Sequence, residues 1–95
     1  MSLSQEEIQR ALREYLKEVY KIKDEDIKCE DNICYTYVNA TKKDIEEFNE
    51  IYESEEEFYN GYYDYAFMNN NRIYIHVEER FLPTEEIEIR VIAMR

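Results

Sequence analysis

Apolar residues recur at helical spacing near the start of the chain. Ser4-x-x-Glu7 has the form of a capping box, in which each residue's side chain satisfies a backbone amide of the other. The apolar positions that follow are three or four residues apart and share one face: Ile8, Ala11, Leu12, Tyr15, Leu16 and Val19. This pattern predicts a helix over 4–22.

The segment 27–39 has the composition of extended chain, with a turn at Asp31-Asn32. A two-residue turn would place Cys29 directly opposite Cys34 in a non-hydrogen-bonded pair, where side chains lie closest. A cross-strand disulfide is therefore geometrically feasible. In a reducing cytosol free thiols are the usual state, with thermophile interiors as the exception, so both states stay open.

A second helix is predicted after Thr41-x-x-Asp44, which supplies another N-terminal cap. Ser54-x-x-Glu57 would extend this helix by a further turn, and Gly61 would end it. The apolar residues that share one face of this helix are Ile45, Phe48 and Tyr52.

Three segments near the C-terminus alternate with period two and predict strands: 62–68, 72–78 and 86–94. We place the first turn at Asn69 to Asn71 and the second at Leu82-Pro83. This register puts one apolar set on a common buried face: Tyr63, Tyr65, Phe67, Ile73, Ile75, Val77, Ile87, Ile89 and Val91.

These elements predict an α+β fold, with two helices packed on one face of a mainly antiparallel sheet. The expected order is helix, one or two strands, helix, then three strands. With 95 residues, 44% of them apolar, one Gly and one Pro, the chain is expected to form a single domain over 1–95.

Charge is distributed unevenly along the chain. The formal net charge is −11, and residues 29–64 hold eleven acids against two bases, whereas the flanking segments are nearly balanced. Such a field repels nucleic acid and anionic membranes and favours basic partners. The chain shows neither a signal-peptide core nor an apolar run of about 20 residues, so we expect a cytoplasmic protein. Its abundance of Glu, Lys, Ile and Tyr fits a heat-loving source.

Carboxylates and aromatic rings alternate between Asp44 and Asp64, without any Lys or Arg. A solubilising helix face would carry Lys for i,i+4 pairing, so here the repulsion is uncompensated. Tyr and Phe are the flat anchors that interfaces favour. One interpretation is a solvated helix face; the other, which we favour, is a strip that imitates nucleic acid and contacts a basic groove. The contact residues would be Glu50, Glu53, Glu55, Glu56, Glu57, Tyr59, Tyr62 and Asp64.

A second patch is expected near one end of the outward sheet face. Apolar residues exposed to solvent there are unfavourable in a monomer, and a homodimer formed through this edge would bury them. They are Met68, Tyr74, Ile92 and Met94.

Candidate catalytic and metal-binding groups are few. His76 is the single histidine, and the predicted register sets it opposite Asp64 and two residues from Glu78. An imidazole with a carboxylate beside it can act as a general base. Without a nearby Ser nucleophile, a Gly-rich loop or a second His, a surface cross-strand pair is the better interpretation. A zinc site needs four Cys or His ligands and the chain has three, so we expect no metal, no cofactor and no enzymatic activity.

A resemblance to a known family is carried by three stretches of the sequence: "IKDEDIKCED", "TKKDIEEF" and "FYNGYYDYAFMNNNRIYIHVEERF". The chain resembles the small acidic anti-CRISPR proteins of archaeal viruses, in particular the inhibitors of the type I-D system. The resemblance implies a stoichiometric inhibitor that binds a nucleic-acid-handling effector in the host cytoplasm and performs no chemistry. Two other hypotheses stand beside it: a self-assembling homodimeric structural protein, and a small enzyme using His76.

Overall fold

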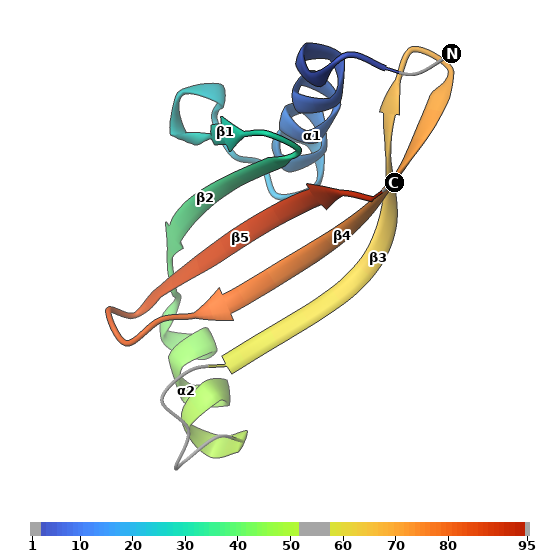
Figure 1. Cartoon of the computed structure of the whole chain (residues 1–95). Helices are drawn as coiled ribbons and strands as arrows, with labels where there is room; N and C mark the ends of the chain where they lie inside the picture. The colour runs from blue at the N-terminus through green and yellow to red at the C-terminus, as the bar shows by residue number, and fades with distance from the viewer. Residues whose placement is uncertain (1–2, 52–57, 95) are drawn as a thin grey trace.

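The computed structural model describes residues 3–51 and 58–94, with side chains for 3–47 and 60–94. Within these ranges two α-helices and a short 3-10 turn accompany a five-stranded antiparallel sheet, so the expected α+β class is confirmed. The elements run in the following order (Figure 1): α1 Gln5–Val19, η1 Asp24–Asp26, β1 Lys28–Glu30, β2 Ile33–Asn39, α2 Lys42–Ile51, β3 Phe58–Met68, β4 Asn71–Phe81 and β5 Glu86–Ala93.

Helix α1 begins with the predicted capping box. The Glu7 amide donates to the Ser4 hydroxyl oxygen at 3.2 Å, and the Ser4 amide donates to Glu7 Oε1 at 3.0 Å. The helix ends at Val19, earlier than predicted, because Lys21 adopts a φ of 60° and turns the chain away. The buried face has the predicted periodicity: Ala11, Leu12, Tyr15 and Leu16.

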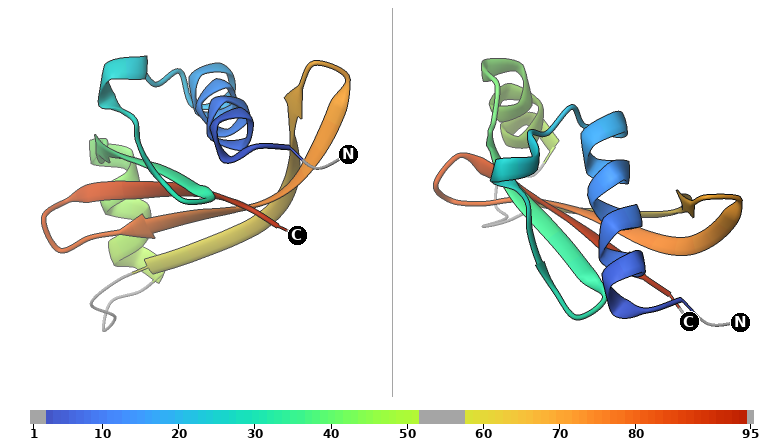
Figure 2. Two further views of the ribbon diagram at one scale, coloured as in Figure 1. Left: turned by 45° about the horizontal axis from the view of Figure 1, so that its top comes forward. Right: turned by 90° about the horizontal axis from the view of Figure 1, so that it is seen from above.

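The sheet has the strand order β1-β2-β5-β4-β3, and α1 lies across one of its faces (Figure 2). We call this the inner face and the opposite one the outer face. Helix α1 contacts β2, β3 and β5. The core lies between them and includes the fully buried side chains of Leu12, Leu16, Cys34, Ile75, Val77 and Val91.

Strand β3 pairs with β4 one residue away from the predicted register. A two-residue turn at Asn69 and Asn70 makes Met68 the partner of Asn71, whereas the prediction used a three-residue turn. Asn69 has a φ of 56°, which Asn tolerates well. Because side chains alternate along a strand, this shift reverses which side of β3 is buried.

The strands β4 and β5 follow the predicted faces. Ile73, Ile75 and Val77 on β4 are buried on the inner face, as are Ile89 and Val91 on β5. Ile87 packs against the same core.

Helix α2 does not pack beside α1 as predicted, but lies at the end of the sheet where β2 finishes and β3 begins (Figure 1). Its predicted cap is present: the Thr41 and Asp44 side chains accept each other's backbone amides at 3.1 and 2.9 Å. Gly61, predicted to end this helix, lies inside β3 instead. The predicted recapping by Ser54 and Glu57 falls outside the described residues.

Candidate protein-interaction surface

The outer face of the sheet exposes large apolar side chains. Tyr63 and Phe67 on β3 are each 59% exposed. Further members of this exposed set on the same face are Tyr37, Tyr65, Tyr74 and Met94. Antiparallel sheets commonly leave one face in water, but that face is then usually polar. An aromatic outer face is therefore unusual for a sheet face that is exposed to water.

Rings of β3 and β4 form a connected group, which we call the tyrosine cluster: Tyr63, Tyr65, Tyr74, His76 and Arg72. The Tyr63 and Tyr74 rings stack with centroids 5.6 Å apart and planes at 9°, and the Tyr65 and Tyr74 centroids lie 5.3 Å apart. The His76 ring lies 4.9 Å from that of Tyr63, and the Arg72 guanidinium carbon lies 4.7 Å above the Tyr65 ring. Contacts of this kind restrict the conformations open to the rings before a partner binds, which lowers the entropy cost of binding.

Charged and polar side chains of the outer face contact one another at several points. Arg80 Nη1 lies 3.8 Å from Glu88 Oε1, and His76 Nδ1 lies 3.8 Å from Glu78 Oε1. The Tyr37 hydroxyl donates to Glu88 Oε2 at 2.8 Å. This hydrogen bond, with a smaller contribution from burial, raises the pKa of Tyr37 above its ordinary value. The face is thus nearly neutral within a strongly acidic protein.

At the end of the molecule that carries α2, the acidic residues that the structure describes outnumber Lys42 and Lys43. Asp44, Glu46 and Glu47 lie on α2, and Glu85 lies in the β4–β5 turn near the start of α2, where its carbonyl accepts the amide of Ala40 at 2.9 Å. Lys43 approaches Glu47 at 4.0 Å, an exposed pair that screens little of this charge.

The predicted acidic-aromatic strip is only partly described. The side chains of Glu50, Glu53, Glu55, Glu56, Glu57 and Tyr59 lie outside the described residues. The two described members, Tyr62 and Asp64, are on the inner face, so their predicted role as free contact residues is wrong. The reversed faces of β3 are the cause.

Tyr62 and Asp64 belong instead to polar contacts between α1 and the sheet. The Tyr20 and Tyr62 hydroxyls are 2.6 Å apart, and the Tyr20 hydroxyl donates to Glu79 Oε2 at 2.7 Å. The Tyr15 hydroxyl donates to Asp64 Oδ2 at 2.6 Å. Burial, followed by these hydrogen bonds, raises the pKa of both Tyr15 and Tyr20.

The predicted dimer patch divides between the two faces. Tyr74 and Met94 are exposed on the outer face, and Ile92 lies beside them, half-buried, opposite His76. Met68, however, is 7% exposed and belongs to the core, so its placement in the patch was wrong for the same reason of register.

The two cysteines form a disulfide. Cys29 and Cys34 are opposite each other on β1 and β2, with Cα atoms 4.1 Å apart, as the two-residue turn at Asp31 and Asn32 required. The bond ties the short edge strand β1 to the sheet.

His76 is on the outer face, as predicted, but its partner differs. Tyr63 is the residue opposite, and Asp64 lies on the other side of β3. Glu78 remains the carboxylate near the imidazole.

Sequence reasoning missed the tyrosine cluster, although its signal was present. Tyr63, Tyr65 and Phe67 were assigned to the core because they alternate and are apolar. The tripeptide Asn69–Asn71 allows either a two- or a three-residue turn, and a two-residue turn points all three rings outward.

The described residues contain no group of three or more His, Cys, Asp or Glu side chains placed to hold a metal ion. In this part of the chain, neither α1 nor α2 is long and apolar enough to cross a membrane. Comparison with protein-family models, with curated proteins and with solved structures gave no match in any of the three.

Proposed function

We propose that this protein is a stoichiometric inhibitor that binds a basic protein and covers its nucleic-acid-binding surface, without catalysing a reaction. The observation that supports this proposal best is the outer face, where Tyr63, Tyr65, Phe67 and Tyr74 are exposed on a rigid sheet. Tyr and Phe in such positions are typical anchors of protein interfaces. The acidic end would attract the partner from a distance and orient it.

The net charge of the protein indicates what kind of partner it binds. A protein of net charge −11 is repelled by nucleic acid, so its binding partner is better sought among proteins that bind nucleic acid. The resemblance to inhibitors of the type I-D CRISPR system names one such partner. On this proposal the protein acts in the cytoplasm of the host cell as a viral counter-defence factor.

The proposal is tested with purified type I-D effector complex and labelled target DNA. Addition of the protein should release the DNA at about one inhibitor per effector, and added salt should weaken the inhibition. The double variant Tyr63→Ser, Phe67→Ser should lose inhibition by at least tenfold. The control is Val19→Ser, because Val19 is 52% exposed but lies at the end of α1.

The acidic run of the sequence between Glu53 and Glu57 receives its own variant in the same assay. Neutralising Glu53, Glu55, Glu56 and Glu57 to Gln should weaken inhibition sharply at low salt and leave the circular dichroism spectrum unchanged. If the native protein leaves DNA binding intact at every ratio, the effector is not its target. If the neutralised variant inhibits fully at moderate salt, the charge-based part of the proposal is wrong.

A second candidate function uses the same face. Tyr74, Ile92 and Met94 lie together on it, and a homodimer formed there would suit a structural or assembly protein. Analytical ultracentrifugation separates the candidates. A dimer that Ile92→Glu dissociates, together with no effect on any nucleic-acid-binding partner, would favour self-assembly.

A further inference from the structure

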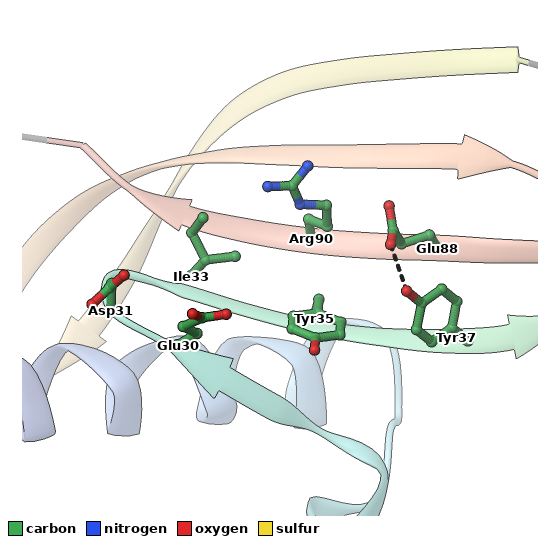
Figure 3. Close-up of a pocket in the computed structure, with 7 residues that line it drawn as sticks. All are labelled: Glu30, Asp31, Ile33, Tyr35, Tyr37, Glu88 and Arg90. Carbon is green, nitrogen blue, oxygen red and sulfur yellow. Dashed lines mark hydrogen bonds between the residues drawn. The ribbon is translucent and has the colours of Figure 1, made fainter.

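The two edges of the sheet differ in how well they are protected from pairing with another chain. The strand order leaves β1 at one edge and β3 at the other. Strand β1 has three residues, two of them charged, and the disulfide ties it to β2; Figure 3 shows this edge, with Glu30 on β1 and Asp31 in the turn that follows. Strand β3 has 11 residues and pairs with β4 without a bulge from Phe58 to Met68. Short, charged or bulged edges resist the addition of a strand, and β3 has none of these protections along most of its length.

The outer edge of β3 presents backbone groups that no other strand uses. Tyr74, opposite Tyr65, turns its carbonyl toward β5, so the backbone of Tyr65 faces the free edge. The outward direction alternates along the strand and recurs at Tyr63 and Gly61. The Tyr65 amide is occupied by Asp64 Oδ1 at 2.8 Å. No residue that the structure describes accepts a hydrogen bond from the amides of Gly61 and Tyr63, so these two remain available to a further strand.

The charge near this edge suits a second copy of the same chain. Residues 58–75 contain one acid, Asp64, and one base, Arg72, although the whole chain has a net charge of −11. A second copy can therefore approach β3 without the repulsion that it meets elsewhere. Two antiparallel β3 strands would also keep the acidic α2 helices apart, because α2 lies at the start of β3 (Figure 1). Each α2 would then lie toward the β3–β4 hairpin of the other copy, which carries Arg72 and no acid between Tyr65 and Ile75.

We propose that β3 pairs with β3 of a second copy, antiparallel and about a two-fold axis, so that the two five-stranded sheets become one continuous sheet. Gly61 of each copy lies opposite Tyr63 of the other. This register uses both available amides, and it sets Asp64 opposite Asn60 of the second copy and not opposite a second Asp64. The Tyr63 ring, 59% exposed in one copy, would cover the side-chain-free surface of Gly61 in the other.

The shape of the sheet confines this pairing to the first part of β3. Figure 2 shows the β3–β4 turn rising beside α1, so the strand curves away from the rest of the sheet toward its end. The proposed pairing ends before that curve, at the Tyr65 amide that Asp64 occupies. It uses a different surface from the patch of Tyr74, Ile92 and Met94, and it does not depend on the proposed function. The aromatic outer faces of both copies would stay open on the same side of the joined sheet.

Hydrogen exchange of the native protein tests the contact without any substitution. Measured by NMR across a concentration series, the amides of Gly61 and Tyr63 should exchange rapidly in dilute samples and more slowly as the dimer forms. The Tyr65 amide is the internal reference, because its acceptor, Asp64 Oδ1, belongs to the same chain. Sedimentation equilibrium of the same samples should show a monomer–dimer equilibrium over this range.

Gly61→Pro removes an outward amide. Since this amide points away from β4, the change should leave the β3–β4 pairing intact, as proline on edge strands does. Two hydrogen bonds are lost per dimer, one from each copy, so the dissociation constant should rise by about tenfold or more. The matched control is Gly61→Ala, which keeps the amide and fits the ordinary negative φ of this glycine. It should dimerise like the native protein.

Ile92→Glu separates this dimer from one formed through the outer face, and it should leave the β3 dimer intact. A chain that is monomeric at every concentration would overturn the inference. A dimer in which the Gly61 and Tyr63 amides still exchange rapidly, or one that Ile92→Glu dissociates and Gly61→Pro does not, would overturn it as well. Should Gly61→Pro fail to fold, as judged by circular dichroism, the exchange rates of the native protein decide the question.

Discussion

The Tyr15 hydroxyl donates a hydrogen bond to Asp64 Oδ2 at 2.6 Å, and this contact joins helix α1 to the edge strand β3. The second oxygen of the same carboxylate accepts the Tyr65 amide at 2.8 Å. Tyr74 is the residue opposite Tyr65, and its carbonyl accepts the Met94 amide, next to β5, at 2.8 Å. The backbone groups of Tyr74 therefore face β5 and not β3. Those of Tyr65 consequently point to the free edge of the sheet. Asp64 therefore holds the helix and also blocks part of an edge that another strand could pair with.

Replacing Tyr15 with Phe should destabilise the protein by about 1.5–3 kcal/mol, the usual range for a hydrogen bond to a charged group. The change removes the hydroxyl that donates to Asp64 and leaves the buried ring in place. Urea unfolding followed by circular dichroism measures the loss. Tyr74→Phe is the control, since Tyr74 is exposed and its expected change is below about 0.5 kcal/mol. Equal stability of the two variants would show that the contact with Asp64 contributes nothing.

Alkaline pH should destabilise the protein through Tyr15 and Tyr20. Their folded-state pKa values are raised above the ordinary value of 10.0, first by burial and then by hydrogen bonds to neighbouring polar groups. The unfolded chain therefore releases these protons at lower pH than the native protein. Their contribution to stability is complete below pH 10 and decreases as the pH rises above it.

Urea midpoints measured across this pH range check the prediction. Tyr20→Phe should lower stability at neutral pH and also flatten its decline at high pH, because one of the two linked protons is gone. A decline as steep in the variant as in the native protein would exclude Tyr20 as a cause.

The sequence was sufficient for the start and the buried face of α1, for the start of α2, and for the buried faces of β4 and β5. Their signals are local: a capping box before α1, and the alternating Ile73, Ile75 and Val77 of β4 and Ile87, Ile89 and Val91 of β5. On β3 the same reasoning chose the wrong face, because Tyr63, Tyr65 and Phe67 are more apolar as a set than the residues that are buried. The register places Asp64 on the inner face, where Tyr15, 49 residues away, donates to its carboxylate, and no local pattern in the sequence records that partner.

The candidate surface was predicted least well, for a related reason. Exposed rings on β3 were taken for core, because one residue more or less in the turn before β4 exchanges the two faces of β3. Ile92 and Met94 were placed on the outer face correctly, because β5 follows simple alternation.

Reduction of the Cys29–Cys34 disulfide should cost about 2 kcal/mol, because the bond closes a short loop and constrains the unfolded chain only modestly. The fold should survive, since β2 remains paired with β5 along its length. Urea unfolding with and without reductant measures the change. The double variant Cys29→Ser, Cys34→Ser should match the reduced protein and should not respond to reductant.

Lys21→Gly should stabilise the protein by about 0.5–1 kcal/mol. Lys21 follows α1 with a φ of 60°, where a side chain is disfavoured and Gly is the preferred residue. The control is Lys17→Gly, which lies within α1 and should cost about 1 kcal/mol. Thermal unfolding resolves changes of this size, and a loss of stability in Lys21→Gly would contradict the left-handed conformation.

Two neighbouring residues on β3 provide a direct test of the register and hence of the outer face. Phe67 is 59% exposed, whereas Met68 is 7% exposed and packs in the core. Met68→Ala should therefore cost about 2–5 kcal/mol, and Phe67→Ala should change stability by less than about 0.5 kcal/mol. Urea unfolding of both variants under one condition measures the difference. The opposite order, with Phe67→Ala the costly change, would return Tyr63, Tyr65 and Phe67 to the core and remove the aromatic surface on which the proposed function depends.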